Sequence, residues 1–369
     1  MKIEKILGLC YLIAIISLVG AQFFFFYQQQ PGYDGQAKDV YAEDDIAYIA
    51  DYYYGLIIMD ASNPSNPYEI GRLDQPSAFR SGKQIYVRNQ IKVAYLVGND
   101  SLRLIDVFDP SNPTQFSVLN IPSSDIEGMF VDYPLFYLYG DYLVSTEMLW
   151  IYNFSNYHNP SQLSSITLED DIFDVCVSED IAYVACGDGL KTIDVSNSSN
   201  PIVLGQIGDE VYYNCVVNDT TVYATKFIDY LDIIDVSDPS NPTIINHYNK
   251  GILSAFGSGI EFLNNTLYIP DGNYGLELID VSDPINPFIY AQFEPIRSTK
   301  NIYIDYPYAY VTCGFEGLVI IDISNPSIWS EYSIINTIIS ITSIGVVACY
   351  IALKLFKHKI GDEHKKNRT

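Results

Sequence analysis

Apolar runs that end in a short polar residue recur along most of this chain. The run Leu276 to Asp280 is typical: mostly apolar positions lead to an Asp, and the pair Asn286-Pro287 follows six residues after that Asp. A tyrosine-bearing segment of strand character precedes each run. Short strands separated by Gly, Asp and Pro turns predict an all-β protein. The runs end at Asp60, Asp106, Asn153, Asp194, Asp235, Asp280 and Asp322.

The spacing of the runs predicts the architecture. Consecutive run ends are 41 to 47 residues apart. A period in this range, built from strands and turns, indicates four-stranded blades repeated around an axis. The runs are apolar on both faces, as expected when other sheets pack on each side. We therefore predict an all-β, seven-bladed β-propeller.

The seven run ends invite a metal or catalytic interpretation, but a structural one explains them better. A short acidic side chain at a strand end can accept hydrogen bonds from backbone N–H groups of the turn that follows. Proline fixes the shape of that turn, as in Asp238 to Pro242. Asn153 can play the same part without charge. We predict that all seven are turn caps.

The runs also resemble a known family. Leu276 to Asp280 and Leu318 to Asp322 each follow a Gly and precede Val-Ser or Ile-Ser and then Asp-Pro or Asn-Pro. In this they are similar to the LVIVD repeat, and the resemblance covers roughly residues 38 to 327. The resemblance implies a β-propeller of a kind often exported or surface-attached in bacteria and archaea. It implies no general catalytic activity and no functional residues. The third unit departs from the motif, so its blade is expected to be distorted.

Two apolar segments flank the repeats. Residues 1–21 have a basic start and an apolar middle, which is typical of a signal peptide or, with the Phe23 to Phe26 run, of an uncleaved anchor. Ser333 to Leu353 contains no charged residue, and six Lys or Arg follow in the last 16 residues. This pattern predicts a propeller ectodomain over 22–331, a transmembrane helix over 332–353 and a basic cytoplasmic tail over 354–369.

Ring closure is a further expectation. Little chain remains between the seventh run and the predicted membrane helix for a fourth strand. We expect Phe23 to Gln28 to supply this strand beside Leu318 to Asp322, which would leave no open sheet edge.

Charge narrows the choice of partners. The net charge is −25, which argues against nucleic acid and anionic lipid as ligands. His158 and His247 fall in separate repeats and are expected to lack a partner cluster, so a zinc site or a His-based triad is not expected. No phosphate loop or nucleophile motif occurs. Cys176 and Cys215 are expected on inner strands of adjacent blades, either bridged or as buried thiols.

These observations favour non-catalytic recognition, adhesion or scaffolding outside the cell, with a protein or glycan as partner. The alternatives are a carbohydrate-processing enzyme with an acidic site at the propeller mouth and a purely structural envelope component. No cofactor is expected, although oxygen-rich loops would suit calcium. Loops that join second to third strands share a face and form the candidate binding face. Its residues are Asp51, Tyr53, Asp100, Asp141, Tyr142, Asp188, Asp229, Tyr230, Asp271, Tyr274 and Glu316.

Overall fold

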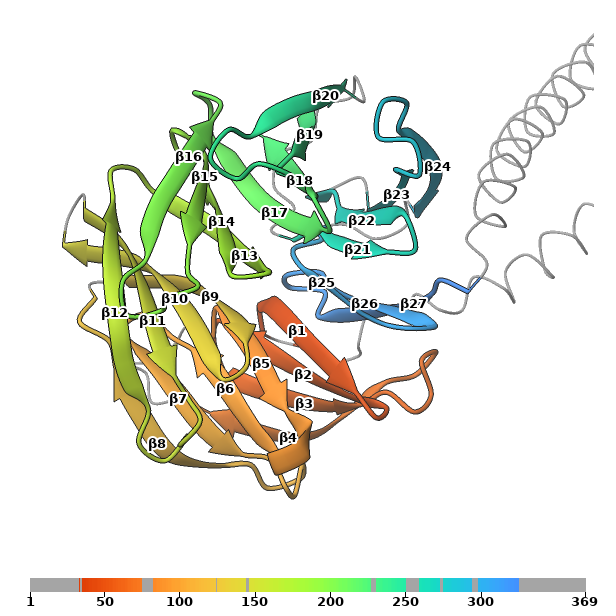
Figure 1. The fold of residues 1–369 in the computed structure, drawn as a ribbon. Helices are drawn as coiled ribbons and strands as arrows, with labels where there is room; N and C mark the ends of the chain where they lie inside the picture. The colour runs from red at the N-terminus through yellow and green to blue at the C-terminus, as the bar shows by residue number, and fades with distance from the viewer. Residues whose placement is uncertain are drawn as a thin grey trace, which may run out of the picture. The chain divides into compact units, whose positions relative to one another are not determined.

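The computed structural model describes residue 33 and residues 35–74, 82–123, 125–143, 146–226, 230–249, 259–272, 275–293 and 298–324, with the backbone alone at 74, 142, 143 and 230. These residues form seven antiparallel sheets that follow one another around a central axis (Figure 1). The prediction of an all-β, seven-bladed propeller is therefore confirmed. Within the described ranges helical structure is limited to a short 3-10 turn, Asn89–Ile91, and 3-10 geometry at Gly272.

The strands of each blade are consecutive in the chain and pair in chain order. The first four blades comprise β1 (Ala37–Glu43), β2 (Ile46–Asp51), β3 (Gly55–Asp60) and β4 (Tyr68–Asp74); β5 (Gln84–Arg88), β6 (Val93–Val97), β7 (Ser101–Asp106) and β8 (Thr114–Asn120); β9 (Asp125–Asp132), β10 (Leu135–Leu143), β11 (Thr146–Asn153) and β12 (Ser161–Leu168); and β13 (Ile172–Ser178), β14 (Ile181–Cys186), β15 (Gly189–Asp194) and β16 (Ile202–Ile207).

The last three blades follow the same order, and the seventh has three strands among the described residues. They comprise β17 (Tyr212–Asn218), β18 (Thr221–Lys226), β19 (Tyr230–Asp235) and β20 (Thr243–Asn249); β21 (Glu261–Leu263), β22 (Thr266–Pro270), β23 (Leu276–Asp280) and β24 (Phe288–Phe293); and β25 (Ile302–Asp305), β26 (Tyr308–Thr312) and β27 (Leu318–Asp322).

The apolar runs form the third strand of each blade, and packing between blades buries them on both faces. In β3, Leu56 to Met59 are at most 2% exposed. The core is divided into clusters that each join adjacent blades; one combines Ile49 and Ile57 of blade 1 with Tyr310 and Ile320 of blade 7. Burial on both faces is why most positions of these strands are apolar.

Each run end binds the turn that follows it. In every blade the side-chain Oδ1 accepts a hydrogen bond from the backbone N–H two residues later, at 2.7 to 2.9 Å. In blade 3 the amide oxygen of Asn153 makes this bond to Ser155. The seven acceptors are Asp60, Asp106, Asn153, Asp194, Asp235, Asp280 and Asp322.

Outer strands pack against the proline turn of the next blade. At Gly71 in β4 a Cβ atom would lie 2.1 Å from the carbonyl oxygen of Pro110, so only glycine allows this approach. At the same position in blade 3, Ser164 Oγ donates a hydrogen bond to the carbonyl oxygen of Ser198 at 2.6 Å. Equivalent contacts to the next blade are made by Gly205 and Asn246.

The first and seventh blades meet directly, and β25 to β27 lie beside β1 in Figure 1. Ala37 N donates a hydrogen bond to the carbonyl oxygen of Gly314 at 3.0 Å. Asn301 Nδ2 donates to Asp39 Oδ1 at 2.8 Å. The predicted contribution of residues 23–28 as a fourth strand beside β27 lies outside the described residues.

The predicted terminal segments also lie outside the described residues. These are the signal peptide or anchor at 1–21, the transmembrane helix at 332–353 and the basic tail at 354–369. A search of the described part of the chain finds no helix with the length and apolar character needed to cross a membrane. The membrane topology therefore stays a prediction from the sequence.

Candidate functional site

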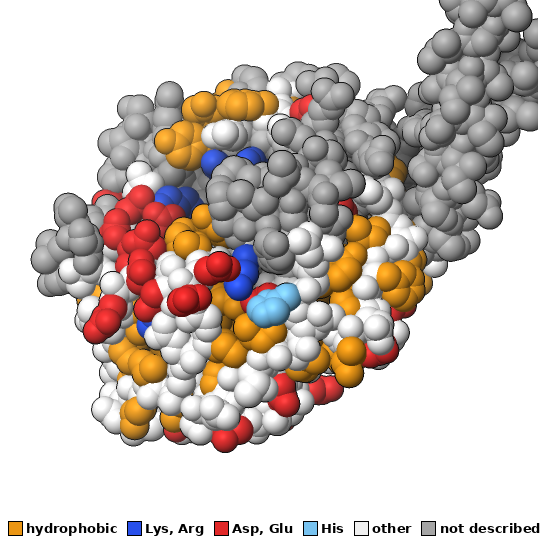
Figure 2. Space-filling view, turned by 90° about the horizontal axis from the view of Figure 1, so that it is seen from above, with side chains coloured by type: hydrophobic (Ala, Val, Ile, Leu, Met, Phe, Trp, Pro, Cys, Tyr) orange, Lys and Arg blue, Asp and Glu red, His pale blue; other side chains and the backbone are white. Residues whose placement is uncertain are grey.

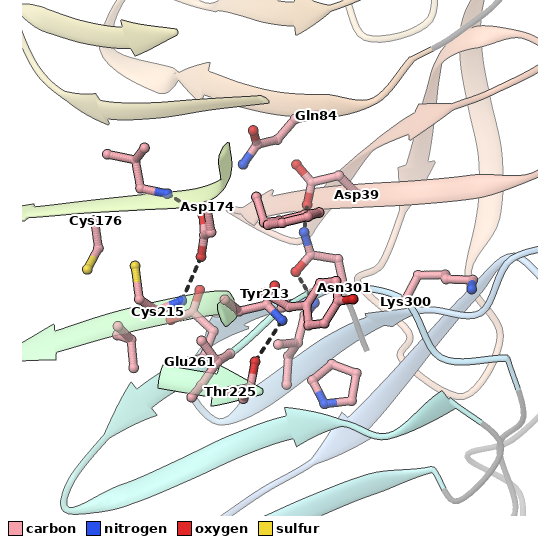
Figure 3. Close-up of a pocket in the computed structure, with 18 of the residues that line it drawn as sticks. Asp39, Gln84, Asp174, Cys176, Tyr213, Cys215, Thr225, Glu261, Lys300 and Asn301 are labelled. Atoms are coloured by element: carbon pink, nitrogen blue, oxygen red, sulfur yellow. Dashed lines mark hydrogen bonds between the residues drawn. The ribbon is translucent and has the colours of Figure 1, made fainter. Parts of the chain in front are cut away.

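The inner strands of the blades enclose a cavity of about 1020 Å³. Its lining comes from all seven blades, and Figure 3 shows part of it. The first strand of each blade begins beside the end of the second strand, as in the pairing of Ala37 with Asp51. The beginnings of the inner strands therefore lie at the same face as the loops that join second to third strands. We call this end of the cavity the mouth.

Equivalent positions on the inner strands form successive layers of the cavity wall. In blade 1, for example, Asp39 pairs with Ala50, which pairs in turn with Leu56 at the start of the apolar run. The same ladder identifies the equivalent residue in the other blades, when its register is extended by two residues in blade 6 and by one in blade 7. We call this layer the polar girdle: Asp39, Gln84, Gly128, Asp174, Asn214, Gly259 and Asn301.

Side chains of the polar girdle tie neighbouring blades together. Asp39 Oδ2 accepts a hydrogen bond from Ile85 N of blade 2 at 2.8 Å. Asp174 Oδ2 accepts one from Cys215 N of blade 5 at 2.9 Å, visible in Figure 3. Gln84 makes the same bond to blade 3. Each acceptor satisfies a backbone donor that would otherwise be buried without a partner at the joint.

The residues that precede the girdle form the layer at the mouth, and they differ strongly between blades. Blades 7, 1 and 2 contribute lysines, blade 3 contributes a glutamate, and blades 4 and 5 contribute aromatic rings. We call this layer the mouth ring: Lys300, Lys38, Lys83, Glu127, Phe173 and Tyr213. The residue of blade 6 at this position lies outside the described residues.

Below the girdle the wall becomes apolar and then aromatic. The next position is apolar or Cys in all seven blades, from Val40 in blade 1 to Ile302 in blade 7. The layer after it includes Tyr41, Tyr303 and one carboxylate, Glu261. The cavity thus has a charged mouth and a largely apolar interior with a few buried carboxyl groups.

Three carboxyl groups of the wall have perturbed acidity. Burial raises the pKa of Asp39 and of Asp174 to about 7, although backbone hydrogen bonds partly oppose this. Burial also raises the pKa of Glu261 to about 8, with added repulsion from Asp39 and Asp174. All three groups therefore exchange protons near neutral pH, because desolvation disfavours the charged form.

A second acidic group lies near the mouth in blade 3. Glu147 is 6% exposed, and its Oε2 atom has no hydrogen-bond partner in the described part of the chain. Burial raises the pKa of Glu147 to about 8, with further contributions from a hydrogen bond to Asp141 and the charge of Asp171. Glu147, Asp141 and Asp171 all line the cavity. They form an acidic side opposite in character to the lysines.

Figure 2 shows one side of the molecule. Acidic side chains gather toward the left of the view, with Lys and Arg side chains beside them. Among the described residues no group of three or more His, Cys, Asp or Glu is arranged to hold a metal ion. Calcium in the oxygen-rich loops stays a prediction from the sequence, because backbone and amide oxygens also serve as calcium ligands.

The predicted binding-face residues have different surroundings. Asp51 is fully buried and accepts hydrogen bonds from Tyr53 N and Tyr54 N, so it anchors a turn. The ring of Tyr53 is 37% exposed and stacks on Phe315, with 6.4 Å between centroids. Asp188 is paired with Lys191. Asp51, Tyr53 and Asp188 do not line the cavity.

Other members of the set are closer to the cavity or cannot be described. Asp141 and Asp271 line it. Asp100 is exposed and Glu316 is half-buried, and neither lines the cavity. Asp229 and Tyr274 lie outside the described residues, as do the side chains of Tyr142 and Tyr230.

His247 has a hydrogen-bond partner that the sequence did not reveal. Its Nδ1 lies 2.7 Å from Oδ1 of Asp232, which is fully buried and also bonds Tyr212 and Lys226. Asp232 and His247 are a cross-strand pair of β19 and β20. The two residues are 15 positions apart in the sequence, on either side of a turn, so the contact could not be read from the local sequence.

Cys176 and Cys215 lie side by side in Figure 3, as expected for inner strands of adjacent blades. Both are buried free thiols. Of the two alternatives left open by the sequence, the structure therefore has the thiols and not the bridge.

Sequence reasoning missed most of the cavity wall. It placed binding on the loops, whereas the varied chemistry lies on the inner strands. The signal was present: Lys38-Asp39, Lys83-Gln84 and Lys300-Asn301 recur at the same place in three repeats. Aligning the inner strands to the apolar runs would have found it.

Comparison with solved structures supports the fold. The WD40 propeller domain of Doa1 is similar at a TM-score of 0.61 and 12% identity, over 81% of this chain and 96% of that one. A functionally unknown protein from Desulfotomaculum acetoxidans gives 0.59 and 15%, over 75% and 90%. A Lactobacillus plantarum protein gives 0.62 and 10%, over 72% and 86%. At these identities the likeness concerns the fold alone.

Comparison by sequence identifies the repeat. No curated protein matches the chain. The model of the LVIVD repeat matches residues 34–75, 171–208, 222–250, 258–293 and 296–337, together half of the chain. The matches omit blades 2 and 3, of which the third was expected to depart from the motif. The expected resemblance is confirmed, and the chain belongs to the LVIVD repeat family.

Proposed function

We propose that this propeller is a non-catalytic recognition module held at the outer surface of a cell membrane. The observation that carries the proposal is the mouth ring, where equivalent positions of one repeat bear cations, an acid and aromatic rings. A scaffold alone needs no such variety at one position. A rigid wall with varied side chains is the usual basis of selective binding.

The proposed location rests on the sequence. The apolar segment at 333–353 and the basic residues after it favour a single span with the propeller outside. Protease treatment of intact cells tests this location. Cleavage of the propeller on intact cells is expected, and full protection until the cells are lysed would contradict it.

The binding role is tested with the full chain in detergent micelles. We expect the protein to bind a component of a glycan array or to retain a protein from extracellular fractions. The double variant Phe173→Ala/Tyr213→Ala removes two rings of the mouth ring and should abolish this retention. Phe108→Ala is the matched control, because Phe108 is 80% exposed and is not among the residues that line the cavity. Equal losses in both variants would contradict a role for the mouth.

A second candidate function is carbohydrate processing. The observation that favours it is Glu147, whose pKa is raised to about 8 beside Asp141. A protonated carboxyl group near a second carboxylate can act as a general acid on a glycosidic bond. Turnover of a chromogenic glycoside that Glu147→Gln abolishes would favour this function. Absence of turnover across a panel, together with ligand retention, would favour recognition.

A further inference from the structure

Three lysines occupy one arc of the mouth ring. Lys300, Lys38 and Lys83 lie at equivalent positions of blades 7, 1 and 2, which are neighbours around the axis. Burial lowers the pKa of Lys38, and the nearby Lys300 and Lys83 lower it further. Three cations crowded at one opening are unusual in a chain of net charge −25.

Of the three lysines only Lys83 has a carboxylate partner in the described part of the chain. Its Nζ lies 2.7 Å from Asp125 Oδ1 and 3.4 Å from Glu127 Oε1. Lys38 Nζ lies 5.4 Å from the centroid of the Tyr52 ring, and within the described ranges neither it nor Lys300 forms an ion pair. The positive charge of blades 7 and 1 is therefore available to a ligand.

The carboxylate that attracts Lys38 is already engaged. Asp51 attracts Lys38 electrostatically, but its Oδ1 binds Tyr53 N and Tyr54 N. Its Oδ2 accepts a hydrogen bond from the Tyr33 hydroxyl group. Asp51 thus does not neutralise Lys38 through a direct pair.

An aromatic surface completes the mouth ring. Phe173 of blade 4 and Tyr213 of blade 5 have ring centroids 4.9 Å apart, with planes inclined at 55°. Both rings are half-buried and line the cavity. Aromatic faces of this kind pack against the apolar faces of sugar rings or other flat groups.

Carboxyl groups elsewhere on the wall set the orientation of an anionic ligand. Glu127 and Asp171, in blades 3 and 4, would repel an anionic group and direct it toward Lys38 and Lys300. Glu261, three positions below the mouth ring on blade 6, can accept hydrogen bonds from hydroxyl groups. The wall therefore combines cations, a ring-stacking surface and hydroxyl acceptors.

We propose that the mouth binds an acidic saccharide, with its carboxylate on Lys38 and Lys300 and a sugar ring against Phe173 and Tyr213. This proposal rests on the recognition function proposed above and names its ligand class. The cations confer preference for the acidic sugar, whereas the aromatic pair contributes to binding of any sugar.

The test measures binding of trigalacturonic acid and of maltotriose, a neutral trisaccharide, to the full chain by titration calorimetry. We expect the acidic sugar to bind at least about tenfold more tightly at low salt and to lose this advantage at high salt. The double variant Lys38→Ala/Lys300→Ala should remove the preference. Lys92→Ala is the matched control, because it removes one charge at a residue outside the cavity lining.

The outcomes separate this proposal from the function on which it rests. Equal affinity for the two sugars, or an unchanged preference in the double lysine variant, overturns the acidic-saccharide proposal while recognition stands. Inorganic phosphate that displaces the acidic sugar completely, with no effect of Phe173→Ala, also overturns it, because it would show a simple anion site. Hydrolysis of a saccharide would contradict non-catalytic recognition itself.

Discussion

The perimeter of this propeller, meaning the turns after the third strands and the outer strands, differs from the cavity wall in how its residues vary between blades. At the perimeter all seven blades repeat one device, in which a side-chain oxygen caps the N–H two residues later. At the mouth ring, equivalent positions carry lysine, glutamate, phenylalanine and tyrosine. Uniformity is expected where every blade must make the same turn and joint. Variation at one equivalent position indicates that the side chain required there differs from blade to blade, which is typical of ligand binding.

The largest effect is expected from a change that disrupts a joint at the perimeter. In Gly71→Val the new Cβ would lie 2.1 Å from the carbonyl oxygen of Pro110, and backbone must move to admit it. We expect the free energy of unfolding, measured in urea, to fall by roughly 3 kcal/mol.

Ser117→Val is the control for this prediction. Ser117 occupies the same position in blade 2, as its pairing with Leu104 shows, and already has a Cβ atom. A similar loss in both variants would mean that the close approach at Gly71 has no special role.

An intermediate effect is expected from pH, with opposite signs in the two regions. In the girdle, burial raises the pKa of Asp39 and Asp174 to about 7. The folded groups stay protonated while the unfolded ones ionise near pH 4, so stability is full below that pH and is lost as pH rises toward 7. Urea titrations should show stability falling between about pH 4 and pH 7, by up to roughly 1.4 kcal/mol per unit of pKa difference for each group.

The double variant Asp39→Asn/Asp174→Asn should make that slope shallower, because only the buried Glu147 and Glu261 then contribute a loss of the same sign. At the perimeter, hydrogen bonds from Ser62 and Ser196 lower the pKa of Asp60 and Asp194. Their contribution is present above the unfolded pKa and is lost as pH falls below about 4, which is a separate window. Stability that rises between about pH 4 and pH 7 in the wild type would contradict the girdle assignment.

The smallest effect is expected at a single cap. Asp194→Asn keeps the oxygen that accepts the N–H of Ser196, as Asn153 already does in blade 3. The urea midpoint at neutral pH should change little, whereas Asp194→Ala should lower it. Equal losses in the two variants would show that charge, rather than the hydrogen bond, is what the turn requires.

The sequence predicted the perimeter better than the cavity, for a physical reason. A cap such as Asp60 bonds a residue two positions away, so the contact is visible in a short stretch of chain. The girdle bond from Asp39 reaches Ile85, 46 residues on, and depends on strand register. Asp51 was assigned to the binding face as a loop carboxylate, but its position at a strand end made it a buried turn anchor.

The contact of each outer strand with the following proline turn has a direction, since Gly71 meets Pro110 of the next blade and never the reverse. Head-to-tail contacts of this kind are not self-complementary, and they continue until the rotation per unit brings the last unit to the first. The angle built into each junction, rather than any terminal signal, therefore limits how many copies the circle accepts. Duplication of one repeat would have to change that angle at every junction at once.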